Sequence, residues 1–193
     1  VSIGSFYSMD DGEIMRLTPD GSKVIVQRPK ETITVSDLKR KGSPLRRNPS
    51  ASIWDMGDNI LLVEYHSKMN AVDPMTIEML KEAVSMAEKE KWKGIVIGND
   101  GKNFSAGANL GLVLVAVNLS AWNEVEEFIR SGQEAYQALK YCSVPVVGAS
   151  AGLCLGGGAE VLLHCDSIQA HSESYIGLVE VGVGIIPAWG GCK

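Results

Sequence analysis

The chain of 193 residues is 45% hydrophobic and 21% charged, which is typical of a globular protein with one sizeable core. Its net charge of −5 argues against nucleic-acid binding, because proteins that bind a duplex usually present a basic face. No apolar run approaches the ~18 residues of a transmembrane helix, and no signal peptide is evident. We therefore expect a cytoplasmic protein that binds neither nucleic acid nor membrane.

The first fifty residues differ from the rest of the chain. Residues 6–27 contain short apolar stretches punctuated by Asp-Gly pairs, which predicts short strands in a hairpin-like arrangement. Residues 39–50, KRKGSPLRRNPS, are basic and rich in turn formers, which favours a solvated linker over a segment that binds an acidic surface. We predict a connector over residues 1–50 and a domain over residues 51–193. Because the first residue is Val1 rather than Met, we expect a piece of a longer protein.

The domain begins with two strands and a helix. Residues 52–57 and 59–66 predict strands joined by a turn at Gly57. Residues 73–90 predict a helix, because apolar residues recur with nearly helical spacing and Pro74 stands near the start.

Further strands and helices alternate toward the C-terminus. Residues 94–99, GIVIGN, and residues 144–150, VPVVGAS, are continuous apolar runs, typical of strands covered on both faces. Between them, residues 120–142 predict a helix with Ser120 as its N-terminal cap. Residues 166–185 predict short strands and turns. This alternation favours a layered α/β fold with a mainly buried sheet.

The spacing of cysteines and histidines predicts neither disulfides nor a metal site. The cysteines form no CxxC pair and mostly lie in apolar surroundings, which favours reduced thiols in an intracellular protein. The histidines lack metal-ligand spacing, and the second of them, in an apolar run, is typical of a core histidine. The residues concerned are Cys142, Cys154, Cys165, Cys192, His66, His164 and His171.

Two loops rich in small residues follow buried strands and lead into helices. They are NFSAGANL, residues 103–110, and LGGGAE, residues 155–160. Such loops expose backbone N–H groups, and two of these aimed at one point would form an oxyanion hole. The spacing alone equally permits close packing of a helix on a strand. The glycine run fits neither a phosphate-binding loop nor a dinucleotide-binding loop.

Glu160 and Glu180 are the candidate acid–base residues, since each lies in an otherwise apolar stretch. A buried carboxyl has a raised pKa and can exchange protons near neutrality. Two carboxyls held close together would separate their pKa values further. Taken singly, each is more typical of a surface residue on a half-buried element. The absence of a GxSxG elbow argues against serine hydrolases, and no Ser-His-Asp set supports a ClpP-like protease.

Three segments together resemble the crotonase superfamily and, within it, the enoyl-CoA hydratases. They are NFSAGANL, PVVGASAGLCLGGGAEVLLHCD and YIGLVEVGVGIIPAWGG, and the resemblance runs from about Ile53 to Lys193. It implies an α/β fold of the ClpP/crotonase type, a spiral of β-β-α units, with the family's C-terminal helices missing from this chain. It also implies an acyl-CoA substrate and a homo-oligomer, typically a trimer.

A narrower resemblance concerns bacterial fusion proteins. EYHSKMNA, VIGNDGKNFSAGANL and GLVEVGVGIIP are similar to the hydratase part of proteins that join a 3-hydroxyacyl-CoA dehydrogenase to an enoyl-CoA hydratase. This implies covalent fusion to a dehydrogenase part, with residues 1–50 as the connector. NAD would serve only that dehydrogenase part. The hydratase part needs no cofactor, because coenzyme A belongs to the substrate.

The resemblance also assigns catalytic roles. The backbone N–H groups of Ala108 and Gly157 would form the oxyanion hole, and Glu160 and Glu180 would be the two acid–base residues. Val179 stands where the family usually has proline before the second glutamate.

Binding roles follow in the same way. Lys68, Asn70 and Ala71 match the segment that contacts the nucleotide part of CoA, and Ala106 would hold the adenine end through its backbone, beside Gly107. The run from Leu112 to Val117 matches the segment that encloses the acyl chain, which favours a medium or long chain. Trp189 replaces a small residue and would line or crowd that pocket. Asn109 stands where many relatives have aspartate.

The pair of glutamates favours an enoyl-CoA hydratase of fatty-acid β-oxidation, which adds water to a trans-2-enoyl-CoA. One alternative is a Δ3,Δ2-enoyl-CoA isomerase, which needs only one carboxylate. A second alternative is a non-catalytic assembly module of a dehydrogenase fusion.

Overall fold

The computed structural model describes residues 6–10, 13–27, 32–89 and 91–192. Contacts within the chain divide it into two compact units, Val1–Ser43 and Pro44–Lys193.

The first unit begins with a small antiparallel sheet, as the hairpin-like pattern predicted. Its strands are β1 (Tyr7–Asp10), β2 (Glu13–Leu17) and β3 (Lys23–Ile25), in that order. Gly21 closes the turn between the last two strands in the left-handed region, with φ of 86°, which glycine adopts without steric strain.

A short helix that the sequence analysis did not predict follows the sheet. Helix α1 (Val35–Lys41) starts at a capping box, in which Thr34 and Asp37 each bond the other's backbone N–H. Its last turn contains Lys39, Arg40 and Lys41, so the first three residues of the expected linker, residues 39–50, are helical.

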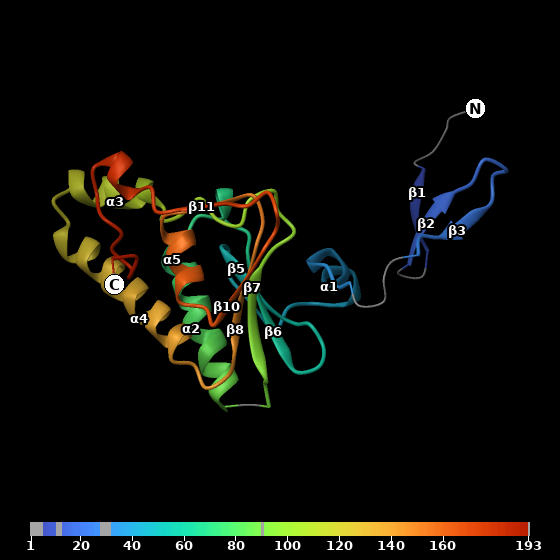
Figure 1. The fold of residues 1–193 in the computed structure, drawn as a ribbon, viewed down its shortest axis with the longest axis horizontal. Helices are drawn as coiled ribbons and strands as arrows, with labels where there is room; N and C mark the ends of the chain where they lie inside the picture. Colours follow the sequence, from blue (N-terminus) through green and yellow to red (C-terminus); the bar gives the residue numbers. More distant parts are fainter. Residues whose placement is uncertain (1–5, 11–12, 28–31, 90, 193) are drawn as a thin grey trace. The chain divides into compact units, whose positions relative to one another are not determined.

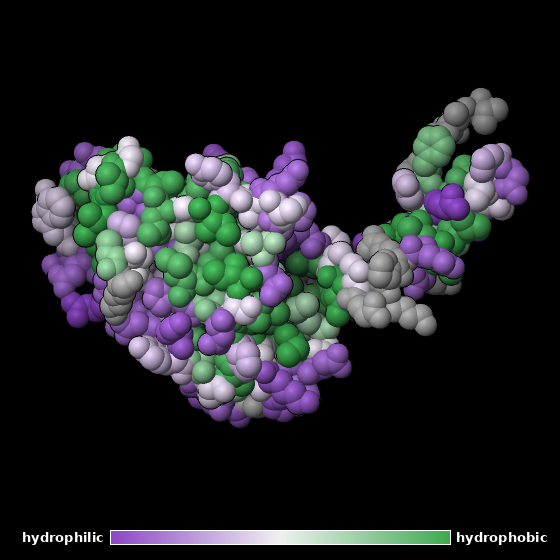
Figure 2. All heavy atoms as spheres, in the orientation of Figure 1, coloured by the Kyte–Doolittle hydropathy of each residue, from purple (hydrophilic) through white to green (hydrophobic). Residues whose placement is uncertain are grey.

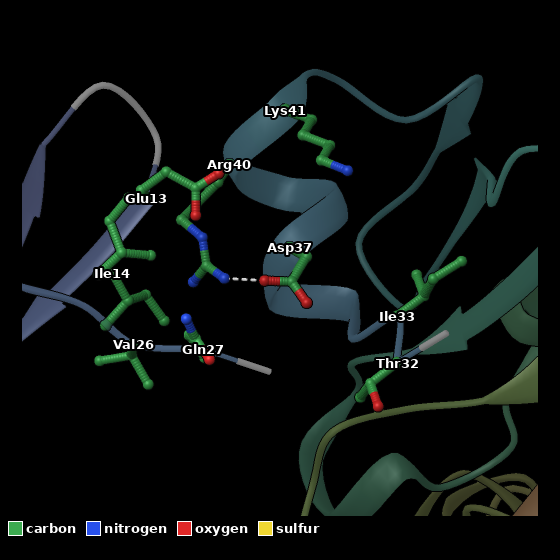
Figure 3. Close-up of a pocket in the computed structure, with 10 residues that line it drawn as sticks. Glu13, Ile14, Val26, Gln27, Thr32, Ile33, Asp37, Arg40 and Lys41 are labelled. Atoms are coloured by element: carbon green, nitrogen blue, oxygen red, sulfur yellow. Dashed lines mark hydrogen bonds and ion pairs between the residues drawn. The ribbon is translucent and has the colours of Figure 1, made fainter. Parts of the chain in front are cut away.

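A cavity of about 750 Å³ lies between this small sheet and α1 within the first unit (Figure 3). Ile14 and Val26 line it from the sheet side, and Asp37 and Arg40 line it from the helix. The Arg40 guanidinium forms an ion pair with Asp37 of the same helix, so α1 satisfies this charge itself.

The second unit contains a six-stranded sheet in the order β10-β8-β7-β6-β5-β4 (Figure 1). Strands β4, β5 and β6 pair antiparallel, whereas β6, β7, β8 and β10 pair parallel. The strands span Arg46–Arg47 (β4), Ala51–Asp55 (β5), Ile60–Tyr65 (β6), Gly94–Gly98 (β7), Val146–Ser150 (β8) and Ser167–Ala170 (β10). The four strands predicted between residues 52 and 150 are thereby confirmed. The pairing of β4 with β5 also places residues 44–50 in this unit, although the sequence analysis divided the chain at residue 50.

Helices cover one face of this sheet. Helix α2 (Pro74–Lys89) packs across β5, β6 and β7, and α4 (Trp122–Lys140) packs against α2 on the side away from the sheet (Figure 1). The short helix α5 (Gly157–Leu163) packs near β8. Large side chains on the facing surfaces are fully buried, and each contributes roughly 1.5–3 kcal/mol of stability. They include Ile53, Leu61, Ile77, Leu80, Ile95, Ile97, Tyr136 and Leu139.

The predicted helix over residues 120–142 is confirmed, but its predicted cap is wrong. A separate helix, α3 (Leu110–Asn118), precedes it, and the residue at the N-cap position of α4 is Ala121. Ser120 has φ of 56°, and its N–H donates to the Val117 carbonyl. Ser120 therefore terminates α3 instead of opening α4.

Short strands and a turn lie within residues 166–185, as predicted, and two further short elements, at residues 153–155 and 68–70, were not predicted. Strands β9 (Leu153–Leu155) and β11 (Tyr175–Gly177) form a two-stranded parallel sheet. Two 3₁₀ turns accompany them, η1 (Lys68–Asn70) and η2 (Glu180–Val183). These short elements position the site described below.

Candidate active site

Two single-residue parallel bridges bring distant loops together beside β9. They pair Val72 with Ala108 and Ser105 with Cys154. In the first bridge, the Val72 N–H donates to the Gly107 carbonyl at 2.8 Å and the Asn109 N–H donates to the Val72 carbonyl at 2.8 Å. Because the neighbours of Ala108 make both of these bonds, the N–H of Ala108 itself points to the opposite side.

The N–H of Ala108 lies beside the N–H of Gly157, the first residue of α5. A Cβ atom on Gly107, where φ is 91°, would lie 2.7 Å from the Leu155 carbonyl oxygen and 3.3 Å from the Gly157 nitrogen. A Cβ atom on Gly157 would lie 3.3 Å from the Ala108 nitrogen. Both positions therefore depend on glycine for this close approach. Neither N–H donates to any other residue in the described part of the chain, so both are free to donate to one substrate oxygen.

Glu160 lies one turn into α5 and is 2% exposed. Its Oε1 accepts hydrogen bonds from the backbone N–H groups of Trp189 at 2.8 Å and Gly191 at 2.9 Å. Burial raises the pKa of this carboxyl, the backbone N–H donors oppose the rise, and the nearby Glu180 carboxylate adds to it. Glu160 is thus a fixed carboxyl whose proton affinity is higher than that of an exposed glutamate.

Glu180 opens η2 and is 8% exposed. Its side chain faces the glycine run, since a Cβ atom on Gly156 would lie 3.1 Å from Glu180 Oε1. Its Oε2 is buried and accepts no hydrogen bond from the residues that the structure describes. A buried carboxylate oxygen without a partner is costly, so this oxygen is suited to bind a water or a substrate group.

A cavity of about 530 Å³ joins both glutamates to the two loops. Apart from these polar groups, its walls are apolar, as is common for pockets that bind small molecules. The apolar side chains come from α3, α4, η2 and the segment after η2, namely Leu110, Val113, Val117, Val125, Phe128, Ile129, Val183, Ile185 and Ile186.

The segment predicted to enclose an acyl chain, Leu112 to Val117, forms most of α3. Only part of it faces the cavity, because Val113 and Val117 line the wall while Leu112, Leu114 and Val115 are exposed. Figure 2 shows hydrophobic spheres in the region where Figure 1 places α3 and η2.

Trp189 lies behind the glycine run and is 4% exposed. A Cβ atom on Gly157 would lie 2.6 Å from its indole Cζ3. The ring lines the cavity next to Ala188, and it is held edge-on against Phe128 and Tyr136 of α4.

Of the residues predicted to bind CoA, Lys68, Asn70 and Ala71 lie at η1, outside this cavity, whereas Ala106 and Gly107 line it. Asn70 donates from Nδ2 to the Asn103 carbonyl at 2.9 Å, so its amide holds the neighbouring loop. The Ala106 N–H donates to the Met69 carbonyl at 3.2 Å. Lys68 is exposed, and Ala71 follows it at the end of the turn. Their binding of CoA stays a prediction.

Sequence reasoning missed one residue of the site. Tyr136 of α4 is fully buried, and its hydroxyl donates to the Gly157 carbonyl at 2.8 Å. A tyrosine within an amphipathic helix gives no local signal that distinguishes this role from ordinary packing.

The predicted core histidine, His164, is buried, and the backbone carbonyl oxygen of Glu160 accepts a hydrogen bond from its Nδ1 at 2.7 Å. Among the described residues, no three metal-ligating side chains cluster. In that same part of the chain, every helix is too short or too polar to cross a bilayer.

Residues 56–193 match the family described as enoyl-CoA hydratase/isomerase, and the chain belongs to this family. The predicted crotonase-type α/β fold is confirmed by solved structures. One is an enoyl-CoA hydratase from Thermoplasma volcanium, with a TM-score of 0.63 and 30% identity, matched over 72% of this chain and 54% of that one.

Two curated relatives are similar to this chain in sequence. The chain is 41% identical over 189 residues to a Bacillus subtilis protein named "Probable 3-hydroxyacyl-CoA dehydrogenase", a match that covers 98% of this chain and 24% of the relative. It is 34% identical to a crotonyl-CoA hydratase from Syntrophomonas wolfei, over 69% of this chain and 51% of that protein. The chain therefore spans about a quarter of the first relative and about half of the second.

Proposed function

We propose that this chain contains the active site of an enoyl-CoA hydratase, which adds water across the double bond of a trans-2-enoyl-CoA. The observation that carries the proposal is one apolar cavity that contains two buried glutamates and two unpaired backbone N–H groups. Family membership supports an acyl-CoA substrate, and the similarity to a named crotonyl-CoA hydratase supports this reaction.

In the proposed reaction, the thioester carbonyl oxygen accepts hydrogen bonds from Ala108 and Gly157. These bonds draw electron density from the conjugated double bond and make C3 electrophilic. A water between Glu160 and Glu180 attacks C3 through its oxygen, and one carboxylate takes its proton. The other carboxyl delivers a proton to C2, so the product is a 3-hydroxyacyl-CoA.

The two N–H groups contribute most where negative charge is greatest, on the enolate-like oxygen of the transition state. Because the fold already fixes them, they need not reorganise during the reaction. The apolar walls exclude bulk water, which strengthens these hydrogen bonds. Glu160, with its raised pKa, is suited to deliver a proton near neutral pH.

The variant Glu180→Gln tests the two-carboxylate mechanism against the isomerase alternative. We expect hydration of crotonyl-CoA, followed by loss of the conjugated thioester absorbance, to fall by about 10²–10⁴-fold, the usual contribution of general acid–base catalysis. The variant Glu173→Gln, at an exposed position of the same segment, is the matched control. Hydration that survives in Glu180→Gln would contradict the mechanism.

A 3-enoyl-CoA substrate completes this test. Isomerisation in the same Glu180→Gln variant, with Glu160 as the single proton shuttle, would favour the isomerase. An assembly module would instead bind CoA tightly while neither substrate is converted.

The context of the reaction follows from the relatives. A match of nearly the whole chain to part of a protein named for 3-hydroxyacyl-CoA dehydrogenase activity supports covalent fusion to such a part, and thereby a role in fatty-acid β-oxidation. The fused dehydrogenase would use NAD and consume the 3-hydroxyacyl-CoA product. We place the protein in the cytoplasm as a homo-oligomer.

A further inference from the structure

The indole of Trp189 is wedged between two glycines on different helices. A Cβ atom on Gly132 of α4 would lie 2.3 Å from the indole Nε1, and a Cβ atom on Gly157 of α5 would lie 2.6 Å from Cζ3. Real Cβ atoms do not approach so closely, so a side chain at either position would displace the ring. The indole therefore spaces α4 from the start of α5.

Aromatic side chains of α4 fix the ring on that helix. Phe128 meets the indole edge-on, with ring centroids 5.1 Å apart, and Tyr136 does so at 5.5 Å. The Tyr136 hydroxyl also donates to the Gly157 carbonyl at 2.8 Å. The ring and this hydroxyl thus connect α4 to the residue that supplies one of the two free N–H groups.

The backbone of the same segment fixes Glu160. The Trp189 N–H donates to Glu160 Oε1 at 2.8 Å, and Gln133 of α4 donates from Nε2 to the Ala188 carbonyl at 2.8 Å. Trp189 therefore contacts Gly157 through its ring and Glu160 through its backbone.

The hydrogen bonding of the indole nitrogen distinguishes two possible roles of the Trp189 ring, packing and hydrogen-bond donation. Trp189 Nε1 is buried without a hydrogen-bond partner among the described residues. Buried tryptophan usually satisfies this N–H, and leaving it unpaired is unfavourable. The contribution of the ring is therefore its shape and position, not a hydrogen bond.

We propose that Trp189 is a positioning residue, which sets the Gly157 N–H and the Glu160 carboxylate relative to each other so that both reach one substrate. This role differs from limiting the length of the acyl chain. It rests on the proposed function, because the two groups must act on the same thioester.

The test compares Trp189→Leu with Trp189→Phe in the full chain. The leucine keeps apolar volume but cannot fill the space between the two glycines, whereas phenylalanine retains a flat ring there. We expect kcat for crotonyl-CoA to fall by about 10²-fold in Trp189→Leu, since misplacing a catalytic group by about 1 Å can cost that much. KM should change little, and Trp189→Phe should recover much of the rate.

Trp122→Leu is the matched control, because Trp122 is 60% exposed at the start of α4. Thermal unfolding of each variant distinguishes a misplaced catalytic group from loss of the fold.

The variant Gly132→Ala provides a second, independent displacement of the indole. This variant should lower kcat in the same way as Trp189→Leu.

A spectroscopic readout keeps this proposal separate from the proposed function. The enolate of acetoacetyl-CoA absorbs in the near ultraviolet, and two aligned N–H donors stabilise it without turnover. We expect the folded Trp189→Leu variant to lose this band and Trp189→Phe to keep it. If wild-type protein forms the band but does not hydrate crotonyl-CoA, the proposed function fails, while the band in the Trp189 variants still shows whether the indole positions the Gly157 N–H.

Two results would overturn the positioning role. One is a folded Trp189→Leu variant with kcat and the enolate band unchanged. The other is a variant in which only KM rises and longer acyl chains react relatively better, which would make the indole a wall of the acyl site.

Discussion

Among the single residues of the site, Glu160 has a carboxyl that the fold almost fully buries and binds through two backbone N–H groups. Burial is the largest of the effects on the pKa of this carboxyl, and it raises that pKa. A folded-state pKa above the unfolded value means that this group stabilises the protein in acid, and that this contribution is lost as pH rises through the folded pKa. The ionised carboxyl therefore stabilises the fold less than the protonated carboxyl does.

The variant Glu160→Gln is accordingly expected to be inactive but more stable than wild type at pH 7. Its amide oxygen can still accept from Trp189 and Gly191, while no charge is buried. The gain should shrink as pH falls toward about 4, near the usual pKa of glutamate. Urea unfolding across this pH range measures it.

Glu127→Gln, at an exposed position of α4, is the control and should show no comparable dependence on pH. A Glu160→Gln variant less stable than wild type at pH 7 would show that the carboxylate is a net stabilising group.

At the level of helices and strands, α3 stands out because none of its residues is buried although it is almost wholly apolar. Leu114 is 62% exposed and Val115 is 59% exposed. A helix that is apolar on every side is normally buried on every side. The inner side of α3 lines the cavity, whereas its outer side presents apolar area to solvent.

The variant Leu114→Lys should therefore keep its stability within about 0.5 kcal/mol, as is usual for surface substitutions. It should also reduce self-association at high concentration, because the exposed apolar patch becomes smaller. Light scattering over a concentration series checks this.

The variant Val113→Lys is the contrasting case, because Val113 faces the cavity. It should lower hydratase activity while affecting association less. Equal scattering by Leu114→Lys and wild type would exclude the outer side of α3 as a contact surface.

Local patterns predicted some elements and failed for others. Helix α2 and strand β7 were predictable because one shows helical spacing and the other an apolar run covered on both faces. Helix α3 has no periodicity, since apolar residues surround it, so only the small-residue loop before it indicated that a helix follows. The T-x-x-D capping box at Thr34 was present in the sequence and could have indicated α1.

The candidate site was predictable only in part. The glycine loops and the two glutamates stood out because small residues and isolated carboxylates in apolar stretches are unusual. The wedge of Trp189 between α4 and α5 was not predictable, because it depends on how Gly132 and Gly157 meet in three dimensions.

Across the whole molecule, the cysteines differ sharply in exposure. Cys154 and Cys165 are buried, and burial raises the pKa of each thiol to about 12. Cys192 is exposed and Cys142 is intermediate. Because the thiolate is the reactive form, the two buried thiols are protected by both burial and protonation.

Thiol labelling at pH 8 should therefore modify Cys192 first and Cys142 more slowly. Cys154 and Cys165 should react only as fast as the fold opens. Mass spectrometry of peptides over a time course distinguishes the four sites, with fully denatured protein as the reference. Labelling of Cys154 as fast as Cys192 would contradict the burial described for β9.

The bridge between Val72 and Ala108 also has a consequence for exchange with solvent deuterium. It bonds the amide of Asn109, and Ser105 Oγ accepts from the amide of Gly107 at 3.1 Å. Ala108 lies between these two protected amides, and its own amide is open. Within three residues the chain thus alternates between slow and fast deuterium uptake, and the fast position is the one that a bound thioester oxygen would protect.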